Sequence, residues 1–401
     1  MDALHIAVIG VPAHGHMNPH LPVLAELVAR GHRVEVTTPS GFAPAVAGTG
    51  ATVVPVTSVL PDEDRGETWP DDPVAGMARF LDEGVHVLPQ ARAAFDDDRP
   101  DVLLGDIGSY PARVLAHQWS RPLVQLSPTY VAWESYEHDM AEVLDGLRAA
   151  PGYTAYHERF AAWLAAEGVP LDVDTFTGRP PRSVVLVPRA MQPHADDVDP
   201  RRYTFVGPAL AVRAHQEEWA VPDRPVLLVS LGSAYSAPVG FYRACLDAFA
   251  DLDRDVVVKV GPAVDPDALG PVPANASVHR WVPQLSVLSH ASAFVTHAGM
   301  GGCSEGLWHG VPMVAVPQAV DQFGNADRLV ELGVGRRLDV DATADELRAA
   351  VATLESSPEV AARCAAVRTE LRAAGGAAGA ADVIEAESAA HQGRAERRSR
   401  R

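Results

Sequence analysis

Short apolar runs that alternate with helical stretches are the feature that most constrains how this chain can fold. Each half contains four short runs rich in Val, Leu, Ile and Ala, as expected of strands buried in a parallel sheet. The predicted strands are residues 5–10, 33–38, 101–106, 123–127, 226–231, 256–260, 293–297 and 311–316. Segments with helical periodicity separate them. This order predicts an α/β protein with two doubly wound domains.

The first helix is the best marked of the expected helices. Asn18 can cap it, Pro19 suits the first helical position, and Gly31 ends it. Residues 11–19 would then form a loop at the carboxyl end of the first strand. Open α/β sheets bind ligands at that end of their strands, so we expect a functional site in this loop.

A mostly polar stretch, residues 212–224, is the expected linker, and we place the domain boundary near residue 216. The predicted N-terminal domain is 1–215, the C-terminal domain is 216–390, and the basic run 391–401 is expected to be a disordered tail. Residues 133–168 are helical in period and rich in aromatic side chains. They are either a helical insertion with its own core or the wall of a pocket for a bulky apolar ligand.

Charge and composition exclude several kinds of partner. The 33 basic and 52 acidic residues give a net charge of −19, which repels nucleic acid and anionic membrane surfaces. Lys259 is the only lysine, so we expect any phosphate to be held by backbone amides, His or Arg rather than by a lysine loop.

The N-terminus has no signal-peptide pattern, and the apolar runs are too short to span a bilayer, so a cytoplasmic protein is expected. Cys245, Cys303 and Cys364 lie far apart in the sequence and form no disulfide framework.

His16, in the loop after the first strand, is a candidate general base because imidazole accepts protons near neutral pH. Asp106 ends another predicted strand and could orient its ring. Alternatives remain: His14, His16 and His20 could bind a metal, His16 could be a plain loop residue, and Asp106 could cap the next helix.

The strongest motif lies in the second half, where a strand ending at His297 is followed by a glycine-rich turn and a helix. Small residues there let backbone amides and the helix dipole approach a phosphate. Glu305 could accept hydrogen bonds from ribose hydroxyls, and Asp321 with Gln322 opens the next strand-to-helix loop. The pattern fits a pyrophosphate with a sugar on either side.

Other enzyme classes fit less well. Gly299-x-Gly301 with Asp321 about 20 residues on permits a dinucleotide-binding site, but Ser304 takes the place of the third glycine. The strand-end motifs pair His with Asp, whereas a glycosidase needs two carboxylates across one sugar. A nucleophile elbow for an acyl hydrolase is not expected, because the serine of Gly302-x-Ser304-x-Gly306 lies in the predicted helix rather than at the turn directly after the strand.

Taken together, Gly15-His16-x-Asn18-Pro19, Asp106, Trp281-x-Pro-Gln284, His297-x-Gly299 and Asp321-Gln322 resemble the inverting UDP-sugar glycosyltransferases of the GT-B type. The resemblance runs almost end to end. Longer strings, such as residues 14–19 and 317–326, are similar to the actinobacterial macrolide glycosyltransferases, among them the oleandomycin glucosyltransferases. This resemblance implies two Rossmann-like domains that face each other across a cleft. The C-terminal domain would bind the nucleotide-sugar donor, and the N-terminal domain would bind the acceptor of the sugar.

The resemblance also implies residue roles. Trp281 would stack on uracil, Gln284 would contact the ribose region, and Glu305 would bind the ribose hydroxyls. Other residues are implied to contact the diphosphate or the hexose, or to lie in the loops around them. They are Ser233, Val282, His297, Gly299, Gly301, Gly302, Asp321 and Gln322. The expected acceptor-binding residues are Ser127, Trp133 and Tyr136.

The implied reaction is transfer of glucose from UDP-glucose to a macrolide hydroxyl, with inversion at the anomeric carbon. His16 would take the hydroxyl proton while Asp106 holds the imidazole, and neither a metal nor another cofactor is required. Glucosylation would inactivate an antibiotic and so suggests self-resistance. The alternatives are a promiscuous glucosyltransferase of phenols and flavonoids, and a non-catalytic protein that binds nucleotide sugars or macrolides.

Overall fold

The computed structural model describes residues 3–62, 65, 67–210, 219–220, 223–232, 238–319 and 321–399. Contacts between Cα atoms divide the chain into two compact units. Unit 1 comprises residues 1–187, 194–209 and 375–401, and unit 2 comprises residues 188–193 and 210–374. The prediction of two α/β domains is confirmed.

Unit 1 is built on a seven-stranded sheet in the order β3-β2-β1-β4-β5-β6-β7, and every neighbouring pair is parallel. Its strands are β1 (His5–Ile9), β2 (Arg33–Thr38), β3 (Thr52–Pro55), β4 (Val102–Asp106), β5 (Leu123–Ser127), β6 (Ser183–Val185) and β7 (Tyr203–Phe205). All five residues of β1 are buried, which explains why apolar residues follow one another in this strand without alternation.

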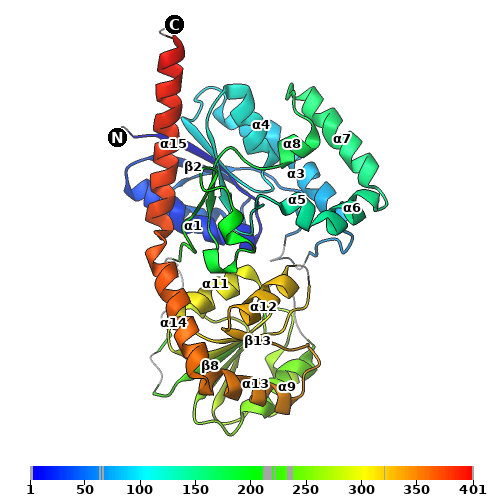
Figure 1. Ribbon diagram of the computed structural model, residues 1–401, viewed down its shortest axis with the longest axis vertical. Helices are drawn as coiled ribbons and strands as arrows, with labels where there is room; N and C mark the ends of the chain where they lie inside the picture. Colours follow the sequence, from blue (N-terminus) through cyan, green and yellow to red (C-terminus); the bar gives the residue numbers. More distant parts are fainter. Residues whose placement is uncertain are drawn as a thin grey trace. The chain divides into compact units, whose positions relative to one another are not determined.

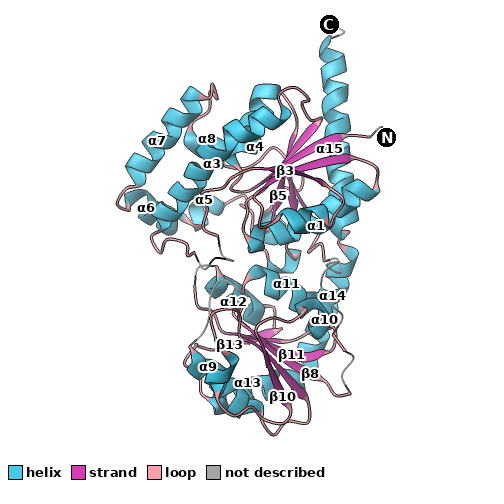
Figure 2. Ribbon diagram, turned by 180° about the vertical axis from the view of Figure 1, so that it is seen from behind, coloured by secondary structure: helices cyan, strands magenta, loops and turns pink. Residues whose placement is uncertain are grey.

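Helices cover both faces of this sheet (Figures 1 and 2). One face packs against α1 (His14–Ala29), α2 (Ala43–Ala47) and α15 (Gly376–Ser399). The other packs against α3 (Pro73–Phe95), α4 (Tyr110–Trp119), α7 (Tyr153–Ala166) and α8 (Val173–Thr177). The core therefore has two apolar layers with the sheet between them.

The expected helical insertion is present between β5 and β6. It contains α5 (Tyr136–Asp139), α6 (Ala141–Ala149), α7 and α8. Tyr156 and Phe160 of α7 are buried with Phe176 of α8 against α3 and α4, so the insertion shares the core of unit 1. Its aromatic residues are explained largely by this packing.

The expected start of α1 is wrong. The helix begins at His14, four residues before the predicted cap, and contains Pro19 and Pro22 in its interior. Pro19 is the sixth residue of this helix, so it removes the hydrogen bond that an amide there would donate to the carbonyl of Gly15. The two histidines expected in a loop, His14 and His16, therefore lie on the first turn of a helix.

Unit 2 has a six-stranded parallel sheet in the order β10-β9-β8-β11-β12-β13. Its strands are β8 (Val226–Ser230), β9 (Asp255–Lys259), β10 (Ala276–His279), β11 (Ala291–Thr296), β12 (Met313–Ala315) and β13 (Gly335–Arg337). Helices α9 (Val239–Phe249) and α13 (Ala344–Ser356) bury one face. Helices α10 (Gln284–Leu288) and α11 (Met300–His309) cover the other, with α12 (Gln322–Glu331) and α14 (Pro358–Ala373) beside α11.

The assignment of the chain's C-terminal part is corrected by the structure. Residues 375–390 were expected in the C-terminal domain and 391–401 in a disordered tail, but 375–401 belong to unit 1 and α15 is helical to Ser399. The expected boundary near 216 lies outside the described residues, and the units divide between Ala209 and Leu210. In the part of the chain described, no helix has the length and apolar character needed to cross a bilayer.

Helix α15 is fixed to α1 by polar contacts as well as by Ala380, Ala381 and Ile384 in the core. Arg30, at the end of α1, donates to Asp382 at 2.7 Å and to Glu385 at 3.1 Å. His32 Nδ1 accepts from the amide of Leu4, and its Nε2 lies 2.9 Å from Glu385 Oε1. Glu385 is therefore the carboxylate on which the attachment of α15 depends.

Replacement of this carboxylate, Glu385→Ala, is expected to lower the free energy of unfolding by about 1–3 kcal/mol, because it removes the carboxylate partner of the buried His32 and one of the acceptors of Arg30, which keeps Asp382. Burial raises the pKa of Glu385, but the hydrogen bonds from His32 and Arg30 outweigh it and hold that pKa below its ordinary value. This contribution is complete above the unfolded pKa of about 4.3 and is lost as the pH falls through the folded pKa.

Urea unfolding of both proteins between pH 7 and pH 3 measures the effect, and Glu370→Ala in the exposed part of α14 is the control. A difference between wild type and Glu385→Ala that persists unchanged at pH 3 would contradict this assignment.

Candidate active site

His16 and Asp106 meet at the carboxyl edge of the sheet of unit 1. Strands β1 and β4 are hydrogen-bonded neighbours, with Ile9 opposite Gly105, so the segments that follow them start side by side. His16 comes from the first turn of α1 and Asp106 is the last residue of β4. The Nδ1 atom of His16 lies 2.9 Å from Asp106 Oδ1, which confirms the contact that the sequence predicts.

The surroundings of Asp106 keep its carboxyl ionised. Its side chain is fully buried, and its Oδ1 also accepts from the amide of Gly108 at 3.2 Å. Burial raises the pKa of Asp106, but the charge and hydrogen bond of His16, together with His20, outweigh burial and hold this pKa below its ordinary value. A permanent negative charge therefore faces the ring of His16, a quarter of which is exposed.

His20 is a member of this cluster that the sequence singled out only as a possible metal ligand. It lies one helical turn after His16 and is 1% exposed, and its Nε2 is 3.4 Å from Asp106 Oδ2. Burial lowers the pKa of His20, so the ring is neutral at pH 7. The nearby His14 instead packs against Phe42 with the two rings tilted and their centroids 5.0 Å apart. Among the described residues, no group of three or more His, Cys, Asp or Glu is arranged to hold a metal ion.

The loops after β8 and β11 form the second site, in unit 2. His297 follows β11, and Ala298 after it has a left-handed φ of 61°. A Cβ atom on Gly299 would lie 2.4 Å from His297 Nε2, and one on Gly232 would lie 2.7 Å from the same ring. Both glycines are therefore required so that the backbone can pass close to the imidazole on two sides.

The electrostatic setting of His297 makes it a neutral hydrogen-bonding group. Burial, followed by the charge of Lys259, lowers the pKa of His297 to about 4. Its Nδ1 is buried and has no hydrogen-bond partner among the described residues. At pH 7 the ring can donate one N–H bond but adds no positive charge.

Helix α11 starts directly after this turn, and its first amides have no acceptor within the helix. A Cβ on Gly302 would lie 3.1 Å from Thr296 Oγ1, so this glycine allows the helix to approach β11. A Cβ on Gly301 would meet nothing within 4 Å, so packing does not explain this glycine. An anion held at the helix N-terminus would explain it. The Cys303 side chain is buried in the core.

A chain of side-chain hydrogen bonds connects the end of β8 with α10 and α11. Ser230 Oγ donates to Gln284 Oε1 at 2.7 Å, and Gln284 Nε2 donates to Glu305 Oε2 at 2.6 Å. Trp281, just before α10, is 53% exposed and offers an open aromatic surface. The side chain of Val282 is buried, which leaves its backbone as the group that a ligand could contact.

Asn325 connects the two strand-to-helix loops of unit 2, a role that the sequence did not reveal. Its Nδ2 donates to the carbonyl of Ala298 at 2.9 Å and to Asp321 Oδ2 at 2.9 Å. Gln322 Oε1 accepts from the amides of Gln318 and Ala319, so its amide group is oriented by the loop. Asp321, in contrast, is exposed.

The predicted acceptor residues lie mostly within the packing of unit 1. The Ser127 hydroxyl is fully buried and donates to the carbonyl of Thr129 at 3.1 Å. Trp133 is 6% exposed, donates to Asp139 and stacks on His194. Tyr136 is half-buried and meets Trp133 edge to face, with ring centroids 5.0 Å apart. The structure thus brings Trp133 and Tyr136 together and leaves Tyr136 the more accessible.

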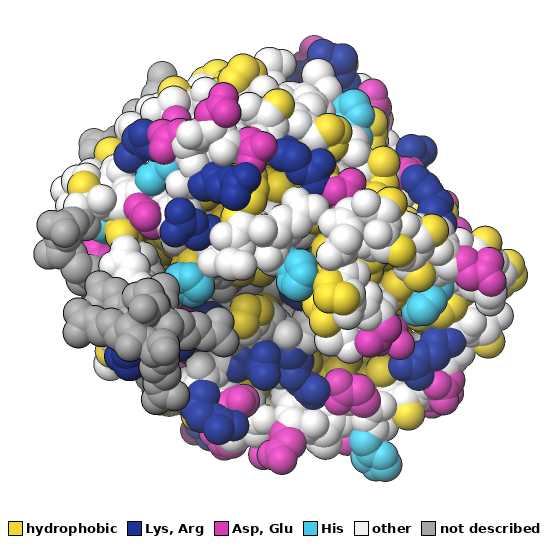
Figure 3. All heavy atoms as spheres, turned by 90° about the horizontal axis from the view of Figure 1, so that it is seen from above, with side chains coloured by type: hydrophobic (Ala, Val, Ile, Leu, Met, Phe, Trp, Pro, Cys, Tyr) yellow, Lys and Arg dark blue, Asp and Glu magenta, His cyan; other side chains and the backbone are white. Residues whose placement is uncertain are grey.

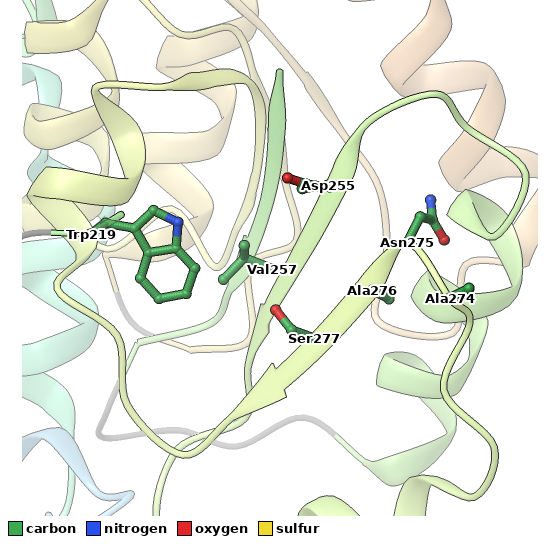
Figure 4. A pocket seen from close by; sticks show the side chains of 7 residues that line it. All are labelled: Trp219, Asp255, Val257, Ala274, Asn275, Ala276 and Ser277. Atoms are coloured by element: carbon green, nitrogen blue, oxygen red, sulfur yellow. The ribbon is translucent and has the colours of Figure 1, made fainter. Parts of the chain in front are cut away.

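Ser233, the remaining predicted donor residue, lies outside the described residues. A hollow against β9 and β10 is lined by Trp219, Asp255, Val257 and Ser277, none of which is a predicted site residue (Figure 4). On the face drawn in Figure 3, basic side chains lie among acidic ones.

Comparison with known proteins supplies the context for these two sites. Residues 243–386 match the family described as "Erythromycin biosynthesis protein CIII-like, C-terminal domain". The chain is 48% identical to the oleandomycin glycosyltransferase of Streptomyces antibioticus, over 98% of this chain and 93% of that protein. It is 37% identical to the NDP-glycosyltransferase YjiC of Bacillus licheniformis, over 96% and 98% of the two chains. The crystal structure of the glycotransferase of kitacinnamycin is 50% identical, with a TM-score of 0.89, and covers 96% of this chain and 99% of that one.

The neutral state of His297 can be tested directly. We expect NMR titration of histidine side chains to give a pKa of about 4 for His297, because burial and the nearby ammonium group both penalise the imidazolium. The resonance is assigned by its loss in His297→Asn. A pKa above 6 for this ring would contradict the described environment.

Proposed function

The chain belongs to the GT-B glycosyltransferases and is a sugar-transferring enzyme, and from this we propose that it moves glucose from UDP-glucose to a hydroxyl group of a macrolide, with inversion at the anomeric carbon. The single observation that carries the mechanism is the hydrogen bond between His16 Nδ1 and the buried Asp106. The relative that is 48% identical bears the name oleandomycin glycosyltransferase, which supports a macrolide as acceptor.

The geometry of this pair assigns a role to each ring nitrogen. Asp106 is ionised and accepts a hydrogen bond, so Nδ1 of His16 carries a proton and Nε2 presents its lone pair. Nε2 takes the proton of the acceptor hydroxyl as the acceptor oxygen bonds to the anomeric carbon. The bond between that carbon and the diphosphate oxygen breaks on the opposite side. The carboxylate stabilises the imidazolium that forms, as in other Asp–His pairs.

The site in unit 2 is the proposed donor site. The amides of Gly301 and Gly302, together with His297, would bind the diphosphate and stabilise the charge of the leaving UDP. Trp281 would stack on the uracil, and the carboxylate of Glu305, oriented by Gln284, would accept from the ribose hydroxyls. Asp321 and the amide of Gln322 would contact the hexose. In this scheme no metal or cofactor takes part.

Modification of a macrolide hydroxyl would abolish the antibiotic's binding to its target, and we propose resistance or self-protection as the biological role. A promiscuous glucosyltransferase of phenols and flavonoids is the second candidate. It is favoured by the accessible Tyr136, because a half-buried aromatic ring can pack against flat phenolic acceptors as well as against a macrolide. A protein that only binds the donor is the third candidate, and transfer of the sugar to either acceptor would exclude it.

Mass spectrometry of the protein with UDP-glucose, a desosamine-bearing macrolide and a flavonol, in EDTA, tests this proposal. We expect a hexose added to the macrolide, and a loss of about 10²–10⁴-fold in kcat for His16→Ala because the general base is removed. The affinity for UDP-glucose should not change in that variant, and the exposed His117→Ala on α4 should react like wild type.

Transfer to the flavonol alone would overturn the macrolide assignment but leave the mechanism in place. Binding of UDP-glucose without transfer to either acceptor would favour a binding protein, and a requirement for added metal would contradict the metal-independent scheme.

Gly301 offers a test of the diphosphate site that separates stability from binding. Gly301→Ala fills open space in a helix, so we expect the free energy of unfolding to stay the same or to rise by up to about 1 kcal/mol. The affinity for UDP should fall by about tenfold or more, equivalent to about 1.4 kcal/mol, because the methyl group occupies the approach to the amides.

Gly240→Ala is the matched control, since Gly240 is the second residue of α9 as Gly301 is of α11, and also meets nothing within 4 Å. Isothermal titration and urea unfolding give the two quantities. Equal UDP affinity in wild type, Gly301→Ala and Gly240→Ala would contradict the assignment of the diphosphate to the N-terminus of α11.

A further inference from the structure

The only lysine of the chain is buried in unit 2. Lys259 is the last residue of β9 and is 8% exposed, whereas the other 32 basic residues are arginines. A buried ammonium group costs free energy unless a negative charge or several hydrogen bonds compensate it. Its position at the carboxyl end of a strand places it at the edge of the sheet where α/β proteins bind their ligands.

The register of the sheet shows which way this residue faces. Lys259 is opposite Ser230 in β8 and opposite His279 in β10, and Ser230 is in turn opposite Thr296 in β11. Residues in register in neighbouring parallel strands project to the same face of the sheet. Lys259 therefore shares the face of Ser230, whose hydroxyl donates to Gln284 in the proposed donor site.

The loops that follow these strands converge above this edge. A Cβ on Gly261, two residues after Lys259, would lie 3.9 Å from the carbonyl oxygen of Gly232. A Cβ on Gly232 would lie 2.7 Å from the ring of His297. The loop after β9 thus touches the loop after β8, which touches His297. The ammonium of Lys259 is close enough to contribute, after burial, to the low pKa of that histidine.

A bound nucleoside diphosphate would bring more negative charge than the described groups around His297 balance. A nucleoside diphosphate carries at least two negative charges, whereas His297 is neutral at pH 7 and the N-terminus of α11 supplies about half a positive charge. The guanidinium of Arg280, just after β10, is exposed and pairs with Asp265. Lys259 differs from Arg280 in being buried, and it lies on the same face of the sheet as Ser230 of the proposed donor site.

We propose that Lys259 is a further donor-binding residue, whose ammonium group pairs with a diphosphate oxygen of the nucleotide sugar and neutralises the charge that grows on the leaving nucleoside diphosphate. The inference rests on the proposed function, since it presupposes a nucleotide-sugar donor in unit 2. It changes the expectation from the sequence that only amides, His or Arg hold the phosphates. The flexible stem of lysine lets the ammonium move to the ligand when the donor binds.

Comparison of UDP with uridine tests this role, because uridine contacts the base and ribose sites but carries no phosphate. For Lys259→Met we expect the affinity for UDP to fall by about tenfold or more and kcat with UDP-glucose to fall as well. The affinity for uridine should stay within about twofold of wild type, and Lys259→Arg should recover most of the UDP affinity because it keeps the charge. Arg280→Gln, which removes an exposed cation from the same unit, should bind both ligands like wild type.

Lys259→Gln is made in parallel, because a neutral amide can satisfy polar neighbours if Lys259→Met does not fold. Equal losses of UDP and uridine affinity, or no loss of either, would overturn the proposal and leave Lys259 a structural residue. If wild type shows no turnover but still binds UDP, dTDP or GDP, only the proposed function is contradicted. The role of Lys259 is then tested by comparing the affinity for that nucleoside diphosphate with the affinity for its nucleoside. If wild type binds no nucleoside diphosphate, both proposals fail.

Discussion

The parallel arrangement of the strands is the constraint on which the rest of the structure depends. Every strand pair in both sheets is parallel, so each connection must cross the sheet, and every strand ends at the same edge as its neighbours. Residues 90 positions apart, such as His16 and Asp106, meet for this reason alone. In unit 2 the same rule brings together Gln284 and Glu305, as well as the loops that hold His297 and Asp321.

The long buried strands could be predicted from sequence because burial on both faces leaves an uninterrupted apolar run. All eight expected strands are present, within two residues at most ends. Five strands of three or four residues, β3, β6, β7, β10 and β13, are not predicted from the sequence. So few residues carry no periodicity of their own, and their pairing is imposed by the sheet, whereas the equally short β12 lies within the apolar run 311–316. The predicted start of α1 is too late because proline favours the first helical position, while Pro19 lies inside the helix.

Motifs at strand ends allowed most of the site to be predicted, whereas residues that act through packing and charge were not. The contact between His16 and Asp106 is readable from residue type and position. The contacts of Asn325 and His20, and the burial of Lys259, depend on which strands are neighbours and on how deeply each side chain is buried, which a single sequence does not specify. The burial of Ser127 and Trp133 among their own neighbours is likewise not specified by residue type, and their assignment to the acceptor site stays a prediction.

The return of the chain to unit 1 at residue 375 has a consequence for engineering. Helix α15 follows the whole of unit 2 in sequence, yet it is fixed to α1 by Arg30, His32 and Glu385 (Figure 1). A chimera made with one crossover near residue 210 would join α1 from one parent to α15 from the other. Exchange of specificity between related enzymes therefore requires two crossovers, so that residues 1–209 and 375–401 are inherited together.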